Sequence, residues 1–111
     1  MKFLDLNLRI ALSIPKEFVV IGGGYVGTEL AGAYANLGSH VTILEGTNSI
    51  LPNFDKDMVS IVVKSLKKKG VDIVTNAMAK SSEQDANSVT VTYEVDGKAS
   101  TVKADYCMVT V

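Results

Sequence analysis

A glycine-rich turn between a buried strand and a helix constrains the fold of this chain more than any other feature. Residues 22–27 read Gly-Gly-Gly-Tyr-Val-Gly and fit the pattern G-x-G-x-x-G. They follow the apolar run 18–21, which is typical of a strand buried on both faces. From Tyr25 to Leu37 apolar residues recur at spacings of three and four, which predicts a helix that Gly38 ends.

The next residues extend this turn into a strand–helix–strand unit. Residues 41–44 form a second apolar run, which Glu45 closes, and the whole unit has the size of a βαβ motif, about 30 residues. Gly22 permits the tight turn, Gly24 lets backbone approach a pyrophosphate, and Gly27 lets the helix pack closely on the strand. The free N–H groups of the helix start would face that anion. The pattern predicts a dinucleotide site, and the alternative is a glycine-rich turn without a ligand.

Glu45 narrows the choice of nucleotide. It lies 18 positions after Gly27, near the spacing at which an acid binds the adenosine ribose. Its carboxylate is expected to accept hydrogen bonds from the ribose hydroxyls and to repel a 2′-phosphate. Residues 46–48 contain no arginine that could hold such a phosphate. We therefore predict NAD rather than NADP; the alternative is that Glu45 only ends a strand in solvent.

The rest of the chain predicts one further helix and several short strands. Asp55 is a good N-cap for a helix that runs to about Lys69 and ends at Gly70. The predicted fold class is α/β, a Rossmann-like βαβ parallel sheet with a small antiparallel β-meander. The remaining strands are expected at 71–75, near 78–82, at 89–95, at 101–104 and at 106–111, with Asp96-Gly97 as a hairpin turn.

Length, charge and cysteine content exclude several classes of protein. With 111 residues the chain is one domain, too short for a two-domain redox enzyme. The net charge is −1 and the basic run 67–69 is interpreted as a solvated helix end, so nucleic acid is not an expected partner. No apolar run is long enough to span a bilayer, and no membrane contact is expected. The single cysteine, Cys107, excludes an internal disulfide and indicates a cytoplasmic setting.

Two other single residues receive structural interpretations. Cys107 lies in an apolar strand and is interpreted as a small buried apolar residue. His40 is the only histidine, and the sequence assigns it no carboxylate partner, so we interpret it as a surface or structural residue.

Residues 1–14 support two interpretations. Apolar residues at every second position from 4 to 14 predict a strand, whereas Leu4, Leu8 and Leu12 also fit a helical spacing. Polar residues interrupt the segment, so it is unlike a signal peptide. We treat 1–14 as an N-terminal segment of uncertain origin and 15–111 as the nucleotide-binding domain.

The residues around the glycine turn resemble a known family. Residues 20–30 resemble the pyridine-nucleotide-binding loop of the flavoprotein disulfide oxidoreductases, the pyridine nucleotide-disulfide oxidoreductase family. The resemblance covers about residues 15–111, and it is closest to the bacterial members that oxidise dihydrolipoyl groups. Further matching segments are Leu37-Gly38, Val41-Thr42, Ile50-Leu51-Pro52 with Asp55, and residues 34–38, 67–71 and 104–106.

The resemblance implies that the chain is the NAD domain of a larger flavoenzyme, inserted in an FAD domain and followed by a dimerisation domain. The parent would be a homodimer within a 2-oxo acid dehydrogenase complex, passing electrons from dihydrolipoyl groups through a disulfide and FAD to NAD⁺. Tyr25 would lie near the nicotinamide, Glu29 would face the nicotinamide amide and a lysine of the FAD domain, and Met78 would lie against the adenine. The residues expected to bind NAD are therefore Gly22, Gly23, Gly24, Tyr25, Val26, Gly27, Glu29, Glu45 and Met78.

Several parts of the family's machinery are absent from this sequence. The family uses two cysteines separated by four residues, an FAD-binding glycine loop and a histidine–glutamate pair, and none of these is present. We therefore assign no catalytic residue and no metal ligand, and expect the chain to bind NAD without turnover. Alternatives are the NADH oxidases, coenzyme A-disulfide reductases and mercuric reductases of the same family, or a stand-alone nucleotide-sensing module.

Overall fold

The structure is a computed structural model that describes residues 14–111. The two interpretations of the segment 1–14 therefore lie outside the described residues except for Ile14. Its elements follow the predicted α/β order. The strand expected near 78–82 and the strand expected at 101–104 are both longer than predicted. The elements are β1 (Glu17–Ile21), α2 (Tyr25–Asn36), β2 (His40–Leu44), α3 (Lys56–Lys68), β3 (Asp72–Val74), β4 (Ala77–Gln84), β5 (Val89–Val95), β6 (Lys98–Ala104) and β7 (Tyr106–Val109).

The strands form a parallel sheet and a separate antiparallel sheet. The parallel sheet has the order β3-β2-β1-β7, so that β1 lies between β2 and β7. The antiparallel sheet has the order β4-β5-β6. The predicted combination of a βαβ parallel sheet and a small antiparallel meander is therefore confirmed.

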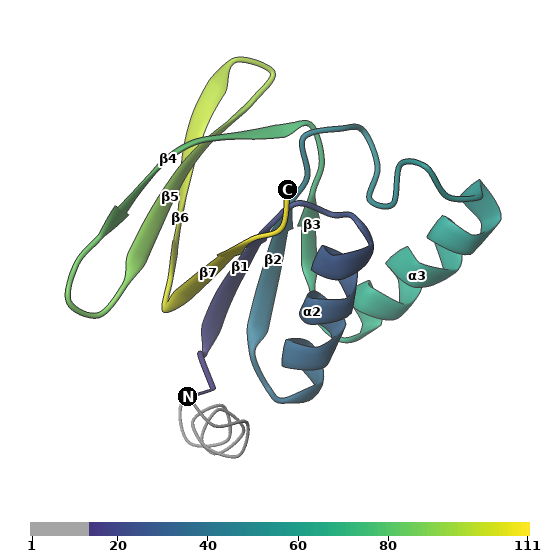
Figure 1. Cartoon of the computed structure of the whole chain (residues 1–111), viewed down its shortest axis with the longest axis horizontal. Coiled ribbons are helices and arrows are strands. Elements are labelled where there is room, and N and C mark those ends of the chain that lie inside the picture. Colours follow the sequence, from purple (N-terminus) through teal and green to yellow (C-terminus); the bar gives the residue numbers. More distant parts are fainter. Residues whose placement is uncertain (1–13) are drawn as a thin grey trace.

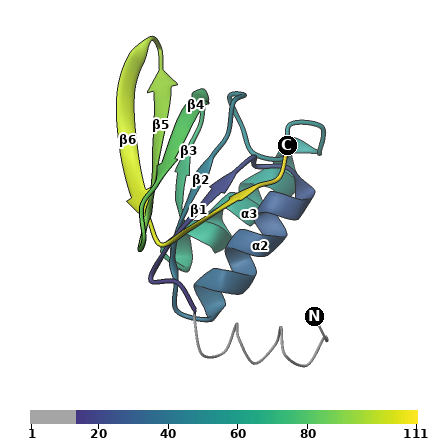
Figure 2. The same ribbon diagram turned by 60° about the vertical axis from the view of Figure 1, so that its left-hand side comes forward.

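The molecule has three layers, with the parallel sheet in the middle (Figure 1). Figure 2 shows both helices on one face of this sheet and β4, β5 and β6 on the other. Side chains alternate along β1, so Phe18 and Val20 pack in the helix-side core while Val19 packs in the core between the two sheets. A strand covered on both faces needs apolar residues at successive positions, which explains the continuous run in the sequence.

The helix ends are where the sequence predicts them. Gly38 follows α2 with φ +104° and Gly70 follows α3 with φ +86°, values that favour glycine. At the start of α3, the Asp55 side chain accepts a hydrogen bond of 2.8 Å from the backbone N–H of Asp57. These local signals fix the lengths of the helices that cover the sheet.

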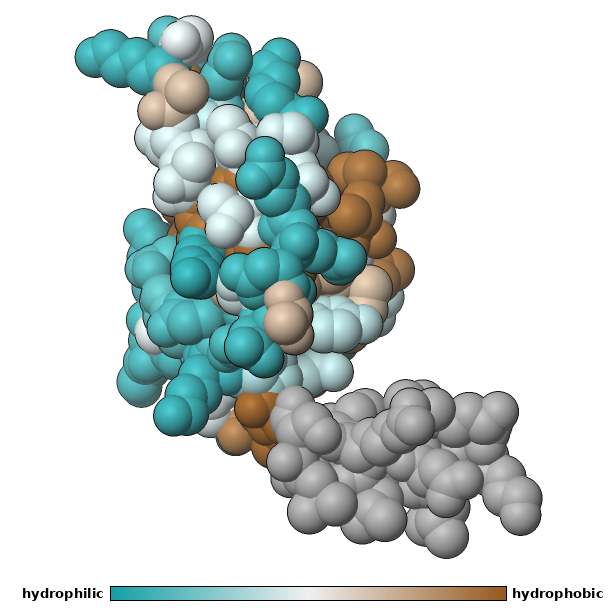
Figure 3. All heavy atoms as spheres, turned by 90° about the vertical axis from the view of Figure 1, so that its left-hand side faces the viewer, coloured by the Kyte–Doolittle hydropathy of each residue, from teal (hydrophilic) through white to brown (hydrophobic). Residues whose placement is uncertain are grey.

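The antiparallel sheet is a hairpin extended by one strand. Asp96 and Gly97 both have positive φ, 52° and 78°, as a two-residue type I′ turn requires. Figure 3 shows a largely hydrophilic surface on this side of the molecule. The described residues contain no helix that is long and apolar enough to cross a membrane.

Candidate functional site

The predicted site residues gather at the carboxyl ends of the parallel strands. The glycine turn follows β1, Glu45 follows β2, and Met78 lies at the start of β4, just after β3. In the sheet, β2 and β3 lie on one side of β1, and β7 lies on its other side. The order of the strands therefore reverses at β1, which marks the switch point of the sheet. In open α/β sheets, ligands bind in the crevice outside the strand ends at such a point.

Gly22 and Gly27 are required by the fold of the protein itself. Gly22 has φ +108°, and a Cβ there would lie 2.6 Å from the Thr110 hydroxyl oxygen. A Cβ at Gly27 would strike the Gly22 carbonyl oxygen, so only glycine lets α2 begin so close to β1. Thr110 in turn donates from its hydroxyl to the Ile21 or Gly22 carbonyl oxygen, at 3.0 and 3.1 Å, which holds the turn against the end of β7.

Gly24 differs from its neighbours because nothing in the described part of the chain requires a glycine there. Its φ of −76° is open to any residue. A Cβ at this position would meet no atom of residues 14–111 within 4 Å. The surface at Gly24 is thus bare backbone that a ligand can approach.

The start of α2 offers unpaired backbone donors beside Gly24. The first helical hydrogen bond runs from Thr28 N to the Gly24 carbonyl oxygen, at 3.0 Å. The N–H groups of Tyr25, Val26 and Gly27 therefore have no acceptor within the helix. Gly24 is the N-cap residue and supplies no capping side chain. Such an end carries a positive partial charge and suits an anion.

Glu45 is buried rather than exposed at its strand end. Only 8% of its surface is accessible, so the alternative of a strand end in solvent is wrong. One carboxylate oxygen, Oε1, accepts from Gly23 N at 2.7 Å. The other, Oε2, accepts from the backbone N–H and the hydroxyl of Thr47, at 2.8 and 2.7 Å. Glu45 thus ties the glycine turn to the loop that follows β2.

The ionisation of Glu45 follows from these contacts. Burial disfavours the charged carboxylate, but the hydrogen bonds from Thr47 and Gly23 outweigh it, and the pKa of Glu45 lies below its ordinary value. Glu45 is therefore a fixed negative charge at neutral pH. Gly23 permits this arrangement, because a Cβ there would lie 2.8 Å from Ile50 and 3.2 Å from Glu45 Oε1.

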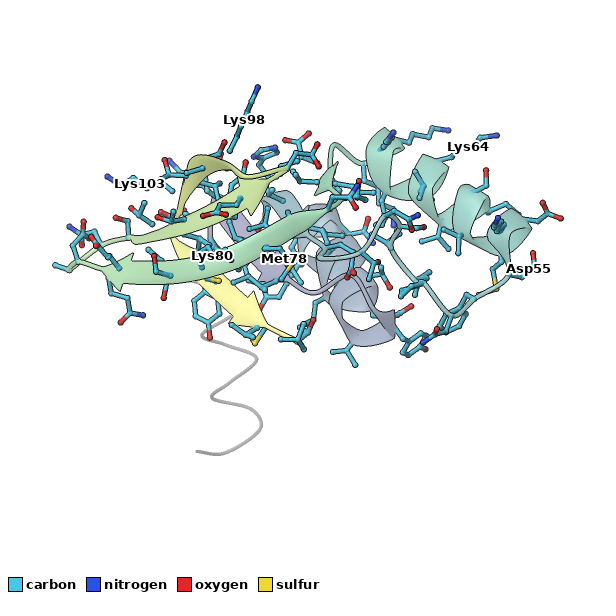
Figure 4. The ribbon with its side chains drawn as sticks, turned by 90° about the horizontal axis from the view of Figure 1, so that it is seen from above. Asp55, Lys64, Met78, Lys80, Lys98 and Lys103 are labelled. Carbon is cyan, nitrogen blue, oxygen red and sulfur yellow. The ribbon has the colours of Figure 1, made fainter. Side chains whose placement is uncertain are left out.

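The remaining predicted site residues lie at the surface around this centre. Tyr25 is 63% exposed, Val26 is 58% exposed, and Glu29 is exposed one turn further along α2. Met78 is half exposed and lies beside Gly46, where a Cβ would be 3.4 Å from its sulfur. Figure 4 shows Met78 near the middle of the molecule, whereas Lys98 and Lys64 point outward. The structure thus brings Met78 next to the strand end that carries Glu45.

Two threonines of the site are absent from the residues predicted from sequence. Thr47 holds the carboxylate of Glu45, and Thr110 holds the carbonyl groups at the end of β1. A hydroxyl residue two positions after an acid is a local signal for a turn, so Thr47 could have been found. Thr110 has no local signal, because its partners lie about 90 residues away in the chain.

The titratable cluster at the opposite end of the sheet lies outside this site. His40 lies 2.7 Å from Glu17 through Nδ1 and 2.8 Å from Asp72 through Nε2. These hydrogen bonds to Glu17 and Asp72 raise the pKa of His40 above its ordinary value. The two carboxylate partners, which the sequence could not assign, give His40 a structural role across three strands.

Cys107 is partly buried between the two sheets and packs near Val19. Burial raises the pKa of its thiol, which disfavours the reactive thiolate. This agrees with the interpretation of Cys107 as an apolar packing residue.

Comparison with known proteins identifies relatives over most of the chain. Residues 17–99 match the family model described as pyridine nucleotide-disulphide oxidoreductase. The chain is 60% identical to the dihydrolipoyl dehydrogenase of Bacillus subtilis (strain 168) over 99 residues, which are 88% of this chain and 21% of the relative. It is 58% identical to the dihydrolipoyl dehydrogenase of Geobacillus stearothermophilus over 98 residues, again 88% and 21%.

A solved structure supports the same conclusion. The HOCl-induced flavoprotein disulfide reductase RclA from Escherichia coli superposes with a TM-score of 0.77 at 33% identity, over 87% of this chain and 21% of that one. The chain therefore spans about a fifth of the length of these relatives. The family model, the sequence relatives and this structure agree with the resemblance found in the glycine turn: the chain belongs to the pyridine nucleotide-disulphide oxidoreductase family.

Proposed function

We propose that this chain is the NAD(H)-binding domain of a dihydrolipoyl dehydrogenase. The observation that carries the proposal is the glycine at position 24. Neither its φ nor packing within residues 14–111 requires a residue without a side chain there. A pyrophosphate that approaches this backbone does explain it, since the N–H groups of Tyr25 and Val26 lie beside it without helical acceptors. Relatives at 55–60% identity are named dihydrolipoyl dehydrogenase, which supports this branch of the family over the oxidases and the other reductases.

In this proposal each part of the site has one task. The helix start binds the pyrophosphate, Glu45 binds the adenosine ribose, and Met78 packs against the adenine. Tyr25 and Glu29 form the wall on the nicotinamide side. When NAD⁺ is bound, its nicotinamide ring supplies the hydride acceptor, and this domain only binds and orients it.

The buried charge of Glu45 supports a preference for NAD(H) over NADP(H). A 2′-phosphate would meet an ionised carboxylate, and residues 46–48 carry no cationic side chain to offset it. The rest of the parent enzyme would hold FAD and the redox disulfide, and would supply the dimer and the 2-oxo acid dehydrogenase complex. A cytoplasmic location is proposed with this assignment.

Titration of the purified chain with NADH and NADPH tests the proposal. Because the flavin-side wall of the pocket lies in other domains, we expect an NADH dissociation constant of about 0.1–10 mM. NADPH is expected to bind at least about tenfold more weakly than NADH, which corresponds to a difference in binding free energy of roughly 1.4 kcal/mol. Equal affinity for the two nucleotides would refute the NAD assignment.

A matched pair of variants tests the role of Gly24. Gly24→Ala is expected to fold normally, since its φ and surroundings accept a Cβ, yet to weaken NADH binding at least about tenfold. Gly32→Ala is the control: it adds a Cβ within α2, the helix that Gly24 caps, and this Cβ would make an ordinary contact of 3.8 Å with Leu66 of α3. If Gly24→Ala binds NADH as well as the control does, the pyrophosphate does not lie at Gly24.

A further inference from the structure

Thr47 engages Glu45 through both its backbone and its side chain. Its N–H and its hydroxyl donate to the same oxygen, Glu45 Oε2, at 2.8 and 2.7 Å. The carbonyl oxygen of Thr47 accepts from Asn76 N at 2.7 Å, and Ala77 N donates to the Glu45 carbonyl at 2.9 Å. The backbone of Thr47 is thus fixed to the start of β4, and only its hydroxyl is free to turn.

The Thr47 hydroxyl has one proton and two acceptors within reach. Glu45 Oε2 lies at 2.7 Å and the Ser49 carbonyl oxygen lies at 2.8 Å. A hydroxyl can donate to only one of them at a time. Rotation about the Cβ–Oγ1 bond turns the hydroxyl proton from one acceptor toward the other, and no heavy atom has to move.

Counting acceptor sites shows why this choice matters for a ribose. A carboxylate offers about four lone-pair sites, and Glu45 fills three of them with Gly23 N, Thr47 N and the Thr47 hydroxyl. One site is left, whereas the two hydroxyls of a ribose need two. If the Thr47 hydroxyl turns to Ser49, Oε2 gains the second site and no donor is left without a partner.

We propose that Thr47 is a positioning residue that holds the Glu45 carboxylate aimed at the nucleotide, and that its hydroxyl turns to Ser49 when a ribose diol binds. This inference rests on the proposed function, because it assigns the ribose to Glu45. It makes Thr47 a determinant of nucleotide affinity and of the discrimination against a 2′-phosphate, although Thr47 acts only through Glu45.

The surroundings of Glu45 make the effect measurable by pH. Among the described residues, the groups that hydrogen-bond to its carboxylate are Gly23 from the glycine turn and Thr47 from the loop after β2, and neither is ionisable. Ile50, which lies beside Gly23, and Met78, which lies beside Gly46, are uncharged. The Thr47 hydroxyl is the strongest of the influences that lower the pKa of Glu45, so its loss shifts the balance toward burial, which favours the protonated acid.

The test compares Thr47→Val, which keeps the shape but removes the hydroxyl, with Thr47→Ser, which keeps the hydroxyl. At about pH 8, Glu45 is ionised in both, and we expect NADH dissociation constants within about twofold of the unaltered chain. At about pH 5, Thr47→Val should bind NADH about five- to tenfold more weakly and should discriminate less against NADPH. Thr47→Ser should follow the unaltered chain at both pH values.

Three outcomes decide between the ideas. If Thr47→Val keeps the pH profile of the unaltered chain, or Thr47→Ser loses it, the inference fails while the proposed function stands. If the unaltered chain binds neither nucleotide at any pH, the proposed function itself fails. Carbon-13 NMR of the Glu45 carboxyl in the unaltered chain needs no variant: its titration midpoint should lie below that of a model glutamate, and a midpoint at or above it would overturn the inference.

Discussion

At the scale of single residues, the glycines of the turn have different causes. Gly22 and Gly27 are required by backbone geometry and by close packing within the chain, so replacing them should change stability. No contact within the described residues requires a glycine at position 24, so replacing Gly24 should change nucleotide binding and leave stability unchanged. The sequence pattern G-x-G-x-x-G treats these positions alike, and only the packing around each one separates a folding requirement from a ligand requirement.

Gly27→Ala is expected to destabilise the fold. Its Cβ would strike the Gly22 carbonyl oxygen, and backbone on both sides would have to shift. We expect a loss of about 1–3 kcal/mol in the free energy of unfolding, measured by urea denaturation. Gly32→Ala on the same helix should instead gain up to about 1 kcal/mol, because alanine favours a helix more than glycine does. Equal stability of the two variants would contradict the close packing at Gly27.

At the scale of elements, His40 connects three neighbouring strands of the parallel sheet. It lies at the amino end of β2 and bridges Glu17 at the start of β1 to Asp72 at the start of β3. The protonated ring can donate to both carboxylates at once, whereas the neutral ring has only one N–H. The bridge is therefore complete only when His40 is charged.

This bridge predicts a pH dependence of stability. The pKa of His40 is raised in the folded chain, so its contribution is fully present below the unfolded value of 6.5 and is lost as pH rises through the folded value. Because the side chain is 44% exposed, solvent screening limits the contribution to about 1 kcal/mol or less. Urea denaturation should show lower stability at about pH 8 than at about pH 6.

His40→Asn is the control for this prediction, since residue 40 is the only histidine in the chain. Its stability should change less between about pH 6 and pH 8 than that of the unaltered chain. Glu17→Gln with Asp72→Asn should remove the same dependence while leaving the histidine in place. A slope that survives in both would show that another group titrates in this range.

The elements that could be predicted from sequence are those with local signals. The ends of both helices depend on Gly38, Gly70 and Asp55, each within a few residues of the element it ends. The hairpin at 96–97 likewise needs only its own two residues. β4 was expected to be shorter because, after the buried Ala77, all its residues are exposed and show no apolar alternation.

The parts of the site that escaped prediction depend on contacts between distant segments. The glycine turn and Glu45 could be identified from spacing, but the hydrogen bond from Gly23 to Glu45 requires the parallel pairing of β1 and β2. Thr110 reaches the turn only because β7 pairs with β1. The apolar pattern of a single strand does not show which other strand will pair with it.

At the scale of the whole molecule, the candidate nucleotide site and the single cysteine lie in different places. The candidate site lies at the carboxyl ends of the parallel strands, while Cys107 is packed between the sheets with a raised thiol pKa. A dithiol exchange needs two cysteines, and the sequence contains one. The proposed role of the chain is therefore to bind a nucleotide, and the chain spans about a fifth of the length of its relatives.

The purified chain is accordingly expected to show no transfer of electrons from dihydrolipoamide to NAD⁺, measured as NADH absorbance. Binding should persist in the same sample, because ligand that prefers the folded state raises its stability, by about 2.7 kcal/mol at 100 times the dissociation constant. NADH should therefore raise the melting temperature, and NADPH should raise it less. Cys107→Ser should leave this ligand-dependent shift unchanged, since the thiol lies away from the glycine turn in the core between the sheets. Turnover that disappears in Cys107→Ser would show that this cysteine is a redox group and that the assignment as a binding domain alone is wrong.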